Sequence, residues 1–366
     1  MSRFLDERFA ALDPYVPGEQ PQDRSYVKLN TNESPFPPSP AVIAALGKEE
    51  AEKLNLYSDP TADVLVEAIA EHFTRVLQAR GAKGMDKEQV FVGNGSDEVL
   101  SFIFQAFCGK DKGMAFPEVG YGFYPVFCEV LGIAANPVPV RDDLSVDVDA
   151  LANVSENIVI ANPNAQTGIY LPVSDIKKLL CANKNRLVVV DEAYCDFGAE
   201  SVVGLLDEFD NLIVVQTMSK SRQLAGGRVG FALASPEIVR DLNMMKYSFN
   251  PYNLNRLSIL AGAAAIGDEE YFASTTAAVA KERERLKGEL TELGFSVTSS
   301  LANFVLAGHP SIGGKELYLA LKKEGVLVRF LSDAKLAPYV RITVGSAEQT
   351  AALIAAIKKV FKEKGI

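Results

Sequence analysis

The chain has 366 residues, of which 48% are hydrophobic, and carries a formal net charge of -10 with a pI near 5.0. A chain of this length can bury a substantial core and is expected to form one large domain with a smaller one attached. The negative charge argues against a nucleic-acid partner, because phosphate backbones are bound through an excess of Lys and Arg.

Cysteine and histidine usage argues against disulfides and metal chemistry. The four cysteines, which show no CxxC pair and no metal-ligand spacing, are Cys108, Cys128, Cys181 and Cys195. They indicate small core residues in a reducing compartment. With only His72 and His309 available, a zinc site or a Ser-His-Asp triad has little to build on.

No uncharged apolar run reaches the roughly 18 residues of a membrane span. The N-terminus is too charged for a signal peptide. We therefore expect a soluble, cytoplasmic protein.

Residues 1–40 are expected to form an arm that joins the smaller domain. Phe4, Leu5, Phe9 and Leu12 recur at helical spacing, which predicts a short amphipathic helix. The following KLNTNESPFPPSP, residues 28–40, is too rich in proline for a regular helix or a central strand. It is either a linker or part of the lining of an active site.

Residues 41–275 alternate short apolar runs with helical ones. The seven expected strands cover residues 90–92, 113–116, 134–140, 158–161, 187–191, 212–217 and 229–234. This alternation predicts an α/β domain with a mostly parallel seven-stranded sheet and helices on both faces. Residues 276–366 differ, since a charged helix is followed by short strands near 304–306, 326–328 and 340–343. A last helix begins with the capping-box pair Ser346 and Gln349, and the segment is expected to form a smaller α+β domain.

A carboxylate and an amine follow two of the expected strands. Asp191 ends the run at 187–191, and Lys220 comes just after the run at 212–217. Parallel α/β sheets gather functional groups at the carboxyl ends of their strands, so both side chains can reach one crevice. Pyridoxal phosphate needs such a pair, because a lysine amine bonds to its aldehyde and an acid keeps its ring nitrogen protonated. The pattern predicts a pyridoxal-phosphate enzyme.

The sequence GNGSDE, residues 93–98, is a candidate site for the cofactor's phosphate. Its glycines allow close backbone approach, and the helix expected from Ser96 points free N–H groups at an anion. Asp97 and Glu98 would repel a phosphate, so Arg228 and the hydroxyls of Ser219 and Ser221 are the expected favourable partners. A plain strand-to-helix turn explains the glycines equally well.

Two further polar groups follow expected strands. Asn164, in NPNAQTG, can bind the phenolic oxygen of the cofactor or serve only a structural turn. Tyr194, three residues beyond Asp191, can share that oxygen or be an ordinary core aromatic residue.

Six motifs in fixed order resemble those of the fold-type I aminotransferases. They are NESPF at 32–36, GNGSDE, NPNAQTG, DEAY, SKS and GGRVG. The segments YVPGE, GYGFYPVF, GVLVRF and YVRITVG narrow the resemblance to the histidinol-phosphate aminotransferase family. The resemblance spans nearly the whole chain.

The resemblance implies a role for each residue at the cofactor. Lys220 carries pyridoxal 5'-phosphate and later moves a proton, while Asp191 pairs with the ring nitrogen. Asn164 and Tyr194 hold the phenolic oxygen, and Tyr121 stacks on the ring. The implied phosphate-binding residues are Gly95, Ser96, Asp97, Ser219 and Arg228.

The substrate side is implied in the same way. Arg341 anchors the anionic end of the substrate, with Arg329 as a second candidate; a guanidinium fork binds carboxylate and phosphate alike. Tyr15 and the loop from Asn32 to Phe36 close over the substrate, and Tyr57 of a second subunit contributes both to the phosphate site of the cofactor and to the substrate site.

The implied activity is that of a homodimer that exchanges an amino group between L-histidinol phosphate and 2-oxoglutarate, giving imidazole-acetol phosphate and L-glutamate, in histidine biosynthesis. An aromatic amino-acid aminotransferase and a threonine-phosphate decarboxylase would keep the same cofactor residues. Regulators that bind the cofactor without catalysis carry a fused DNA-binding segment. This chain shows no basic arm of that kind, so a non-catalytic sensor of the cofactor is disfavoured. The family often has proline where Gln166 stands and a large apolar residue at Gly227. Neither position supplies a reacting group.

Overall fold

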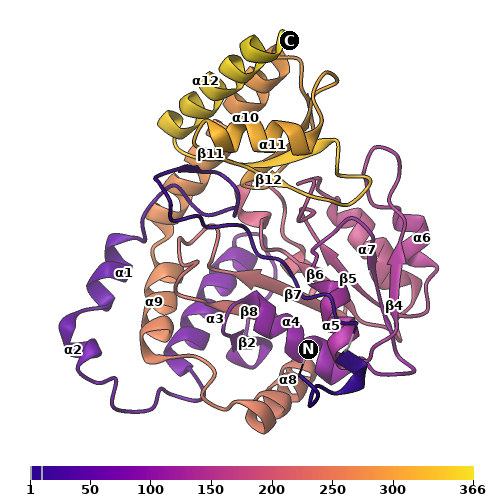
Figure 1. Ribbon diagram of the computed structural model, residues 1–366. Helices are drawn as coiled ribbons and strands as arrows, with labels where there is room; N and C mark the ends of the chain where they lie inside the picture. The colour runs from indigo at the N-terminus through magenta and orange to yellow at the C-terminus, as the bar shows by residue number, and fades with distance from the viewer. Residues whose placement is uncertain (1, 10) are drawn as a thin grey trace.

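The computed structural model describes residues 2–9 and 11–366, and its centre is a seven-stranded sheet (Figure 1). The strand order is β2-β8-β7-β6-β5-β3-β4. The strands are β2 (Val90–Gly93), β3 (Met114–Pro117), β4 (Ala135–Val138), β5 (Asn157–Ala161), β6 (Val188–Asp191), β7 (Leu212–Thr217) and β8 (Gly230–Leu233). β8 runs antiparallel to both of its neighbours, β2 and β7, and the other neighbouring pairs of the sheet are parallel. The predicted α/β fold with a mostly parallel seven-stranded sheet is confirmed.

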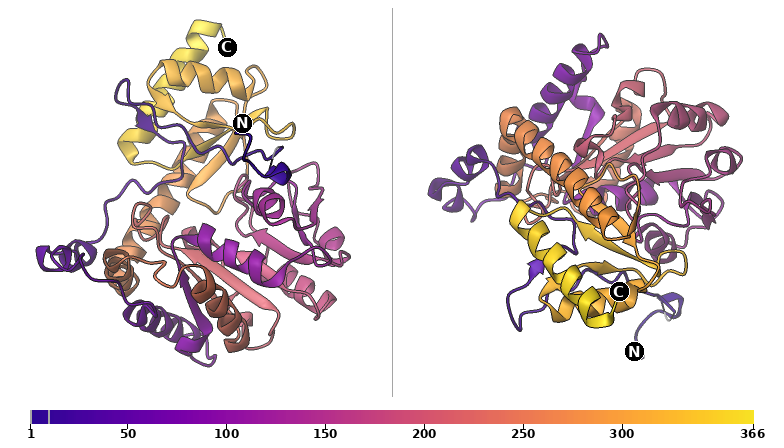
Figure 2. Two further views of the ribbon diagram at one scale, coloured as in Figure 1. Left: turned by 60° about the horizontal axis from the view of Figure 1, so that its bottom comes forward. Right: turned by 90° about the horizontal axis from the view of Figure 1, so that it is seen from above.

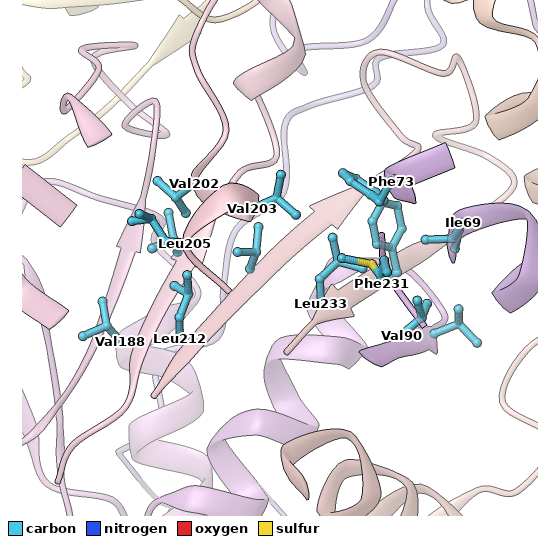
Figure 3. Packing of buried hydrophobic residues seen from close by; sticks show 14 of the residues in the cluster. Ile69, Phe73, Val90, Val188, Val202, Val203, Leu205, Leu212, Phe231 and Leu233 are labelled. Atoms are coloured by element: carbon cyan, nitrogen blue, oxygen red, sulfur yellow. The ribbon is translucent and has the colours of Figure 1, made fainter. Parts of the chain in front are cut away.

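Both faces of this sheet are buried because its strands are apolar at consecutive positions. Within β6, Val188 and Val190 belong to one core cluster and Val189 to another. Figure 3 shows the first of these clusters, in which Val188 and Leu212 lie on the same face as Phe231.

Helices cover both sides of the sheet. The helices that contribute to the first cluster are α1 (Pro40–Ala45), α3 (Asp63–Gln78), α6 (Val148–Ala152), α7 (Val173–Ala182) and α9 (Arg256–Gly267). Those that contribute to the second are α4 (Ser96–Phe107), α5 (Tyr124–Leu131) and α8 (Pro236–Phe249). The four-residue helix α2 (Lys48–Ala51) follows α1.

The C-terminal part forms a second, antiparallel sheet of order β12-β13-β10-β9, stacked at one end of the large sheet (Figure 2). Its strands are β9 (Ser296–Val297), β10 (Phe304–Gly308), β12 (Arg329–Phe330) and β13 (Tyr339–Thr343). The helices of this part are α10 (Glu269–Glu292), α11 (Gly314–Lys323) and α12 (Ala347–Lys364). In the arm, β1 (Val27–Lys28) pairs with β11 (Val326–Leu327). The domain limits stay a prediction, and α10 runs through the limit at 275/276.

The helix predicted from Phe4 to Leu12 is wrong. The described residues of this region hold only a 3-10 turn, Glu7–Phe9, and residue 10 lies outside the described residues. Phe4 is 80% exposed. The apolar face of the predicted helix therefore has no partner surface within the described part of the chain, and a short helix without tertiary packing is not stable. Within residues 2–9 and 11–366, no helix is both long and apolar enough to cross a membrane.

Candidate active site

A cavity opens where the carboxyl ends of β6 and β7 meet the N-terminal arm and the small sheet. It brings together twelve of the predicted site residues. These are Tyr15, Asn32, Ser96, Asp97, Tyr121, Asp191, Tyr194, Ser219, Lys220, Arg228, Arg329 and Arg341. Gly95 lies directly behind this lining, against Arg228. Asn164 and Tyr57 do not line the cavity.

The connection between β7 and β8 places Lys220 and Arg228 at the same edge of the sheet. Because β8 is antiparallel to β7, it begins where β7 ends, and Thr217 pairs with Gly230. A side chain at Gly230 would meet the backbone nitrogen of Ser96 at 2.3 Å. Glycine there therefore lets the N-terminus of α4 pack against the strand, beside Arg228.

The acid of the site is Asp191, which is 4% exposed at the end of β6. Its Oδ2 accepts a hydrogen bond from the hydroxyl of Tyr124 at 2.9 Å, and its Oδ1 accepts one from the backbone N–H of Ala193 at 3.2 Å. Burial raises the pKa of Asp191 to about 6, whereas the bond from Tyr124 acts to lower it. Tyr124 thus favours the ionised carboxylate.

Tyr124 was not among the predicted site residues. It begins α5, is fully buried, and packs edge-to-face against the ring of Tyr121 with centroids 5.5 Å apart. A buried tyrosine needs a partner for its hydroxyl, which is a usable signal. The partner lies 67 positions away, however, and only the fold identifies it.

The amine of Lys220 loses its proton at a lower pH than an exposed lysine does. Burial is the main cause that lowers its pKa to about 8, and the positive charge of Arg341 lowers it further, while Glu33 acts in the opposite direction. Nζ lies 3.5 Å from the backbone oxygen of Thr31 and 5.9 Å from the ring centre of Tyr194. A lysine with this pKa can act both as a nucleophile and as a base near neutral pH.

A guanidinium and a helix N-terminus lie together in the corner of the cavity that holds Asp97. The N-terminus of α4 begins at Ser96, and Nη2 of Arg228 lies 3.3 Å from Oδ2 of Asp97. Asp97 also accepts a hydrogen bond from Tyr121 at 2.7 Å. The glycine at 95 has a φ of 83°, and a Cβ there would meet Nη2 of Arg228 at 2.5 Å. The corner therefore combines a guanidinium with a helix N-terminus.

Asn164 stabilises the turn that follows β5, which is the structural role that the sequence left open for it. Its Oδ1 accepts from the backbone N–H groups of Gln166 and Thr167, and its Nδ2 donates to the oxygen of Val119 at 2.7 Å. The amide carries a second Nδ2 hydrogen. Tyr194 differs, because its hydroxyl lines the cavity and accepts from Nδ2 of Asn32 at 3.1 Å.

Two arginines face the other end of the cavity. Arg329 of β12 and Arg341 of β13 are directly paired across the strands, so their side chains share one face. Arg329 donates to the backbone oxygens of Val16 and Pro17 in the arm. Two like charges directly opposite each other destabilise a sheet, and a bound anion would relieve this repulsion.

Tyr57 lies outside the cavity of its own chain. It is 81% exposed and stacks on Tyr252 with ring centres 4.7 Å apart. Its predicted contribution to a second subunit's site stays a prediction.

The fold and the family are identified by comparison with known proteins. A structure of histidinol-phosphate aminotransferase from Sinorhizobium meliloti in complex with pyridoxal-5'-phosphate superposes with a TM-score of 0.84, covering 99% of this chain and 100% of that one at 24% identity. It shows that the two share a fold. The profile of the family "Aminotransferase class I and II" matches residues 24–357. The chain belongs to this family.

Curated relatives match over almost the full length. A histidinol-phosphate aminotransferase from Clostridium acetobutylicum is 43% identical over 98% of this chain and 99% of its own. One from Marinomonas sp. is 45% identical with the same coverage of both chains.

Proposed function

We propose that this protein is a pyridoxal-phosphate-dependent aminotransferase that exchanges the amino group of L-histidinol phosphate with 2-oxoglutarate, in histidine biosynthesis. The observation that carries the proposal is the shared cavity, in which the Lys220 amine, the Asp191 carboxylate and the paired arginines face one space. The choice of substrate is supported by the near full-length relatives named histidinol-phosphate aminotransferase.

The residues present fit pyridoxal 5'-phosphate. Gly95 and Gly230 leave room that a side chain would fill, so Arg228 and the N-terminus of α4 can lie together at the phosphate. Ser219 lines the same corner, and Tyr121 forms a wall beside it. Asp191 would hold the ring nitrogen and Tyr194 would serve the phenolic oxygen. The role of Asn164 at that oxygen stays a proposal, since its amide has a second Nδ2 hydrogen but does not line the cavity.

Bound cofactor supplies an aldehyde that accepts an amino group and a protonated ring that stabilises negative charge developed at the substrate's Cα. Lys220 would hold the cofactor through Nζ, and the same nitrogen would be placed to take the Cα proton of the substrate. The carboxylate of Asp191 would keep the ring nitrogen protonated. Tyr15, at the outer wall, helps to exclude water.

The anionic end of either substrate is assigned to the paired arginines. Nη1 of Arg341 is bonded within the protein, but its Nε is buried and has no hydrogen-bond partner among the described residues. Nε and Nη2 form the side of the guanidinium that binds carboxylate or phosphate oxygens in pairs. This pair of nitrogens suits both a phosphate monoester and a dicarboxylate.

A homodimer that shares its sites is part of the proposal. Exposed apolar side chains gather around Tyr57 on the connection after α2 and near the end of α8; they include Leu54, Leu56, Tyr57 and Phe249. Such exposed groups support a surface that a second copy covers. The four free cysteines support a reducing compartment, in agreement with a cytoplasmic enzyme.

A comparison of three amino donors tests the substrate assignment. Purified enzyme with 2-oxoglutarate should turn over L-histidinol phosphate far faster than phenylalanine, and should not decarboxylate phosphothreonine. Glutamate formation and carbon dioxide release are the measurements. Negligible turnover of histidinol phosphate would refute the assignment while leaving the aminotransferase family intact.

A further inference from the structure

Gln166 makes a contact that its place in the sequence did not suggest. Its Oε1 accepts a hydrogen bond from Nη1 of Arg341 at 2.9 Å, across 175 positions of sequence. The backbone oxygen of Ala165 accepts from the same Nη1 at 2.9 Å. An Nη atom carries two hydrogens, so these two acceptors satisfy it completely.

The turn that carries Gln166 is held in place by its own hydrogen bonds. The backbone N–H groups of Gln166 and Thr167 both donate to Oδ1 of Asn164, and the hydroxyl of Thr298 donates to the backbone oxygen of Thr167. These bonds fix the backbone of the turn relative to Asn164 and to Thr298 of the C-terminal part, and the Ala165 oxygen and the Gln166 side chain extend from this backbone to Arg341.

This arrangement determines which edge of Arg341 remains free. With Nη1 bonded to the turn, and with the guanidinium 5.1 Å above the ring centre of Phe304, rotation of the group is restricted. The edge formed by Nε and Nη2 is then the one that can take an external anion. The buried Nε has no partner among residues 2–9 and 11–366.

The chemistry of the acceptor matters as much as its position. An amide oxygen orients a guanidinium without cancelling its charge, whereas a carboxylate at the same place would form an ion pair and compete with the substrate. Proline, which the family often has here, offers no side-chain acceptor. Gln166 therefore adds an orienting contact and leaves the positive charge available.

We propose that Gln166 is a positioning residue that holds Arg341 with its Nε–Nη2 edge directed at the anionic end of the substrate. The inference rests on the proposed function, because that function gives Arg341 its anion. It extends the function by naming the residue that sets the geometry and charge of the anion pocket.

Equilibrium binding of an anionic ligand to the holoenzyme tests the positioning role of Gln166. 2-Oxoglutarate cannot accept an amino group from the pyridoxal form, so its binding can be measured by calorimetry without turnover; inorganic phosphate is a second probe. We expect Gln166→Ala to raise the dissociation constant of 2-oxoglutarate about tenfold and Gln166→Glu about a hundredfold. Gln105→Glu, which adds the same charge on α4 away from the cavity, should bind like wild type.

Steady-state kinetics should show that the Gln166 variants affect substrate binding more than catalysis. Since the anion is bound in both the ground state and the transition state, the Gln166 variants should raise KM for both substrates more than they lower kcat. Cofactor absorbance and the melting temperature report whether each variant is folded and loaded. If Gln166→Glu fails to fold, the alanine variant carries the test.

A double-mutant cycle separates positioning from a general effect. In an Arg341→Ala background, Gln166→Glu should cost little further affinity, because the group that it orients is gone. An equal loss in both backgrounds would overturn the proposal, as would unchanged affinity in folded, loaded Gln166→Glu. If wild type ignores histidinol phosphate but Gln166→Glu still loses 2-oxoglutarate, the substrate assignment falls and the role of Gln166 stands.

Discussion

The two sides of the cavity are built differently. Asp191 and the strand before Lys220 belong to β6 and β7, which have hydrogen-bonded neighbours on both sides in the middle of the large sheet. Arg329 comes instead from the two-residue edge strand β12, Tyr15 comes from the arm, and Arg341 comes from β13, which lies inside the small sheet between β12 and β10. The proposed reacting groups thus lie on the large sheet, and the proposed substrate-selecting groups lie on the small sheet and the arm.

This comparison predicts the largest loss for the amine on the sheet side. Lys220→Ala should reduce transamination by at least about ten-thousandfold, because general acid–base catalysis alone contributes roughly 10²–10⁴-fold and the covalent link is lost as well. Borohydride reduction followed by mass measurement should attach the cofactor to wild type but not to the variant. Lys178→Ala, on the exposed face of α7, serves as control. Attachment at another residue would contradict the assignment.

The next largest effect on the sheet side concerns a residue that touches the acid. Tyr124→Phe removes the hydrogen bond that favours the ionised form of Asp191, so the pKa of Asp191 should rise further. We expect cofactor affinity, measured by titrating apoenzyme with pyridoxal 5'-phosphate, to fall about tenfold, the usual cost of an unpaired buried acceptor. Tyr170→Phe removes a hydroxyl bonded to a surface carbonyl and should have no effect. Unchanged affinity in Tyr124→Phe would mean that Ala193 alone suffices.

The same division explains what the sequence could predict. Local patterns were sufficient for the seven strands, for the start of α4 at Ser96 and for the capping box of Ser346 and Gln349, because each depends on neighbours in sequence. Asp191 and Lys220 could be placed together because strand ends converge in a parallel sheet.

Contacts between distant segments could not be predicted in this way. The bonds of Tyr124 to Asp191 and of Gln166 to Arg341 span 67 and 175 positions, and no local pattern encodes them. The failed helix near Phe4 has the same cause, since apolar spacing produces a helix only where tertiary packing supports it.

The pH dependence of cofactor uptake should report the pKa of Lys220, which is lowered both by burial at the large sheet and by Arg341 of the small sheet. Because the pKa of Lys220 is lowered to about 8, mainly by burial, the neutral amine is absent at low pH and present at high pH. Uptake by apoenzyme should rise about tenfold from about pH 7 to about pH 9, as expected for one group titrating near 8. Arg341→Ala removes a charge that lowers this pKa, so it should move the midpoint upward. A flat profile over this range would exclude Lys220 as the titrating group.

The smallest expected effect belongs to the arm. Glu19 contacts Lys322 and Tyr318 of α11, and so tethers the segment whose Val16 carbonyl accepts from Arg329. These groups are partly exposed, and exposed ion pairs contribute little. Glu19→Ala should therefore raise KM for both substrates only about twofold to threefold, with kcat unchanged. Glu363→Ala on α12 is the control. A large fall in kcat would mean that the arm positions reacting groups, and the division between a reacting side on the large sheet and a selecting side on the small sheet and the arm would no longer hold.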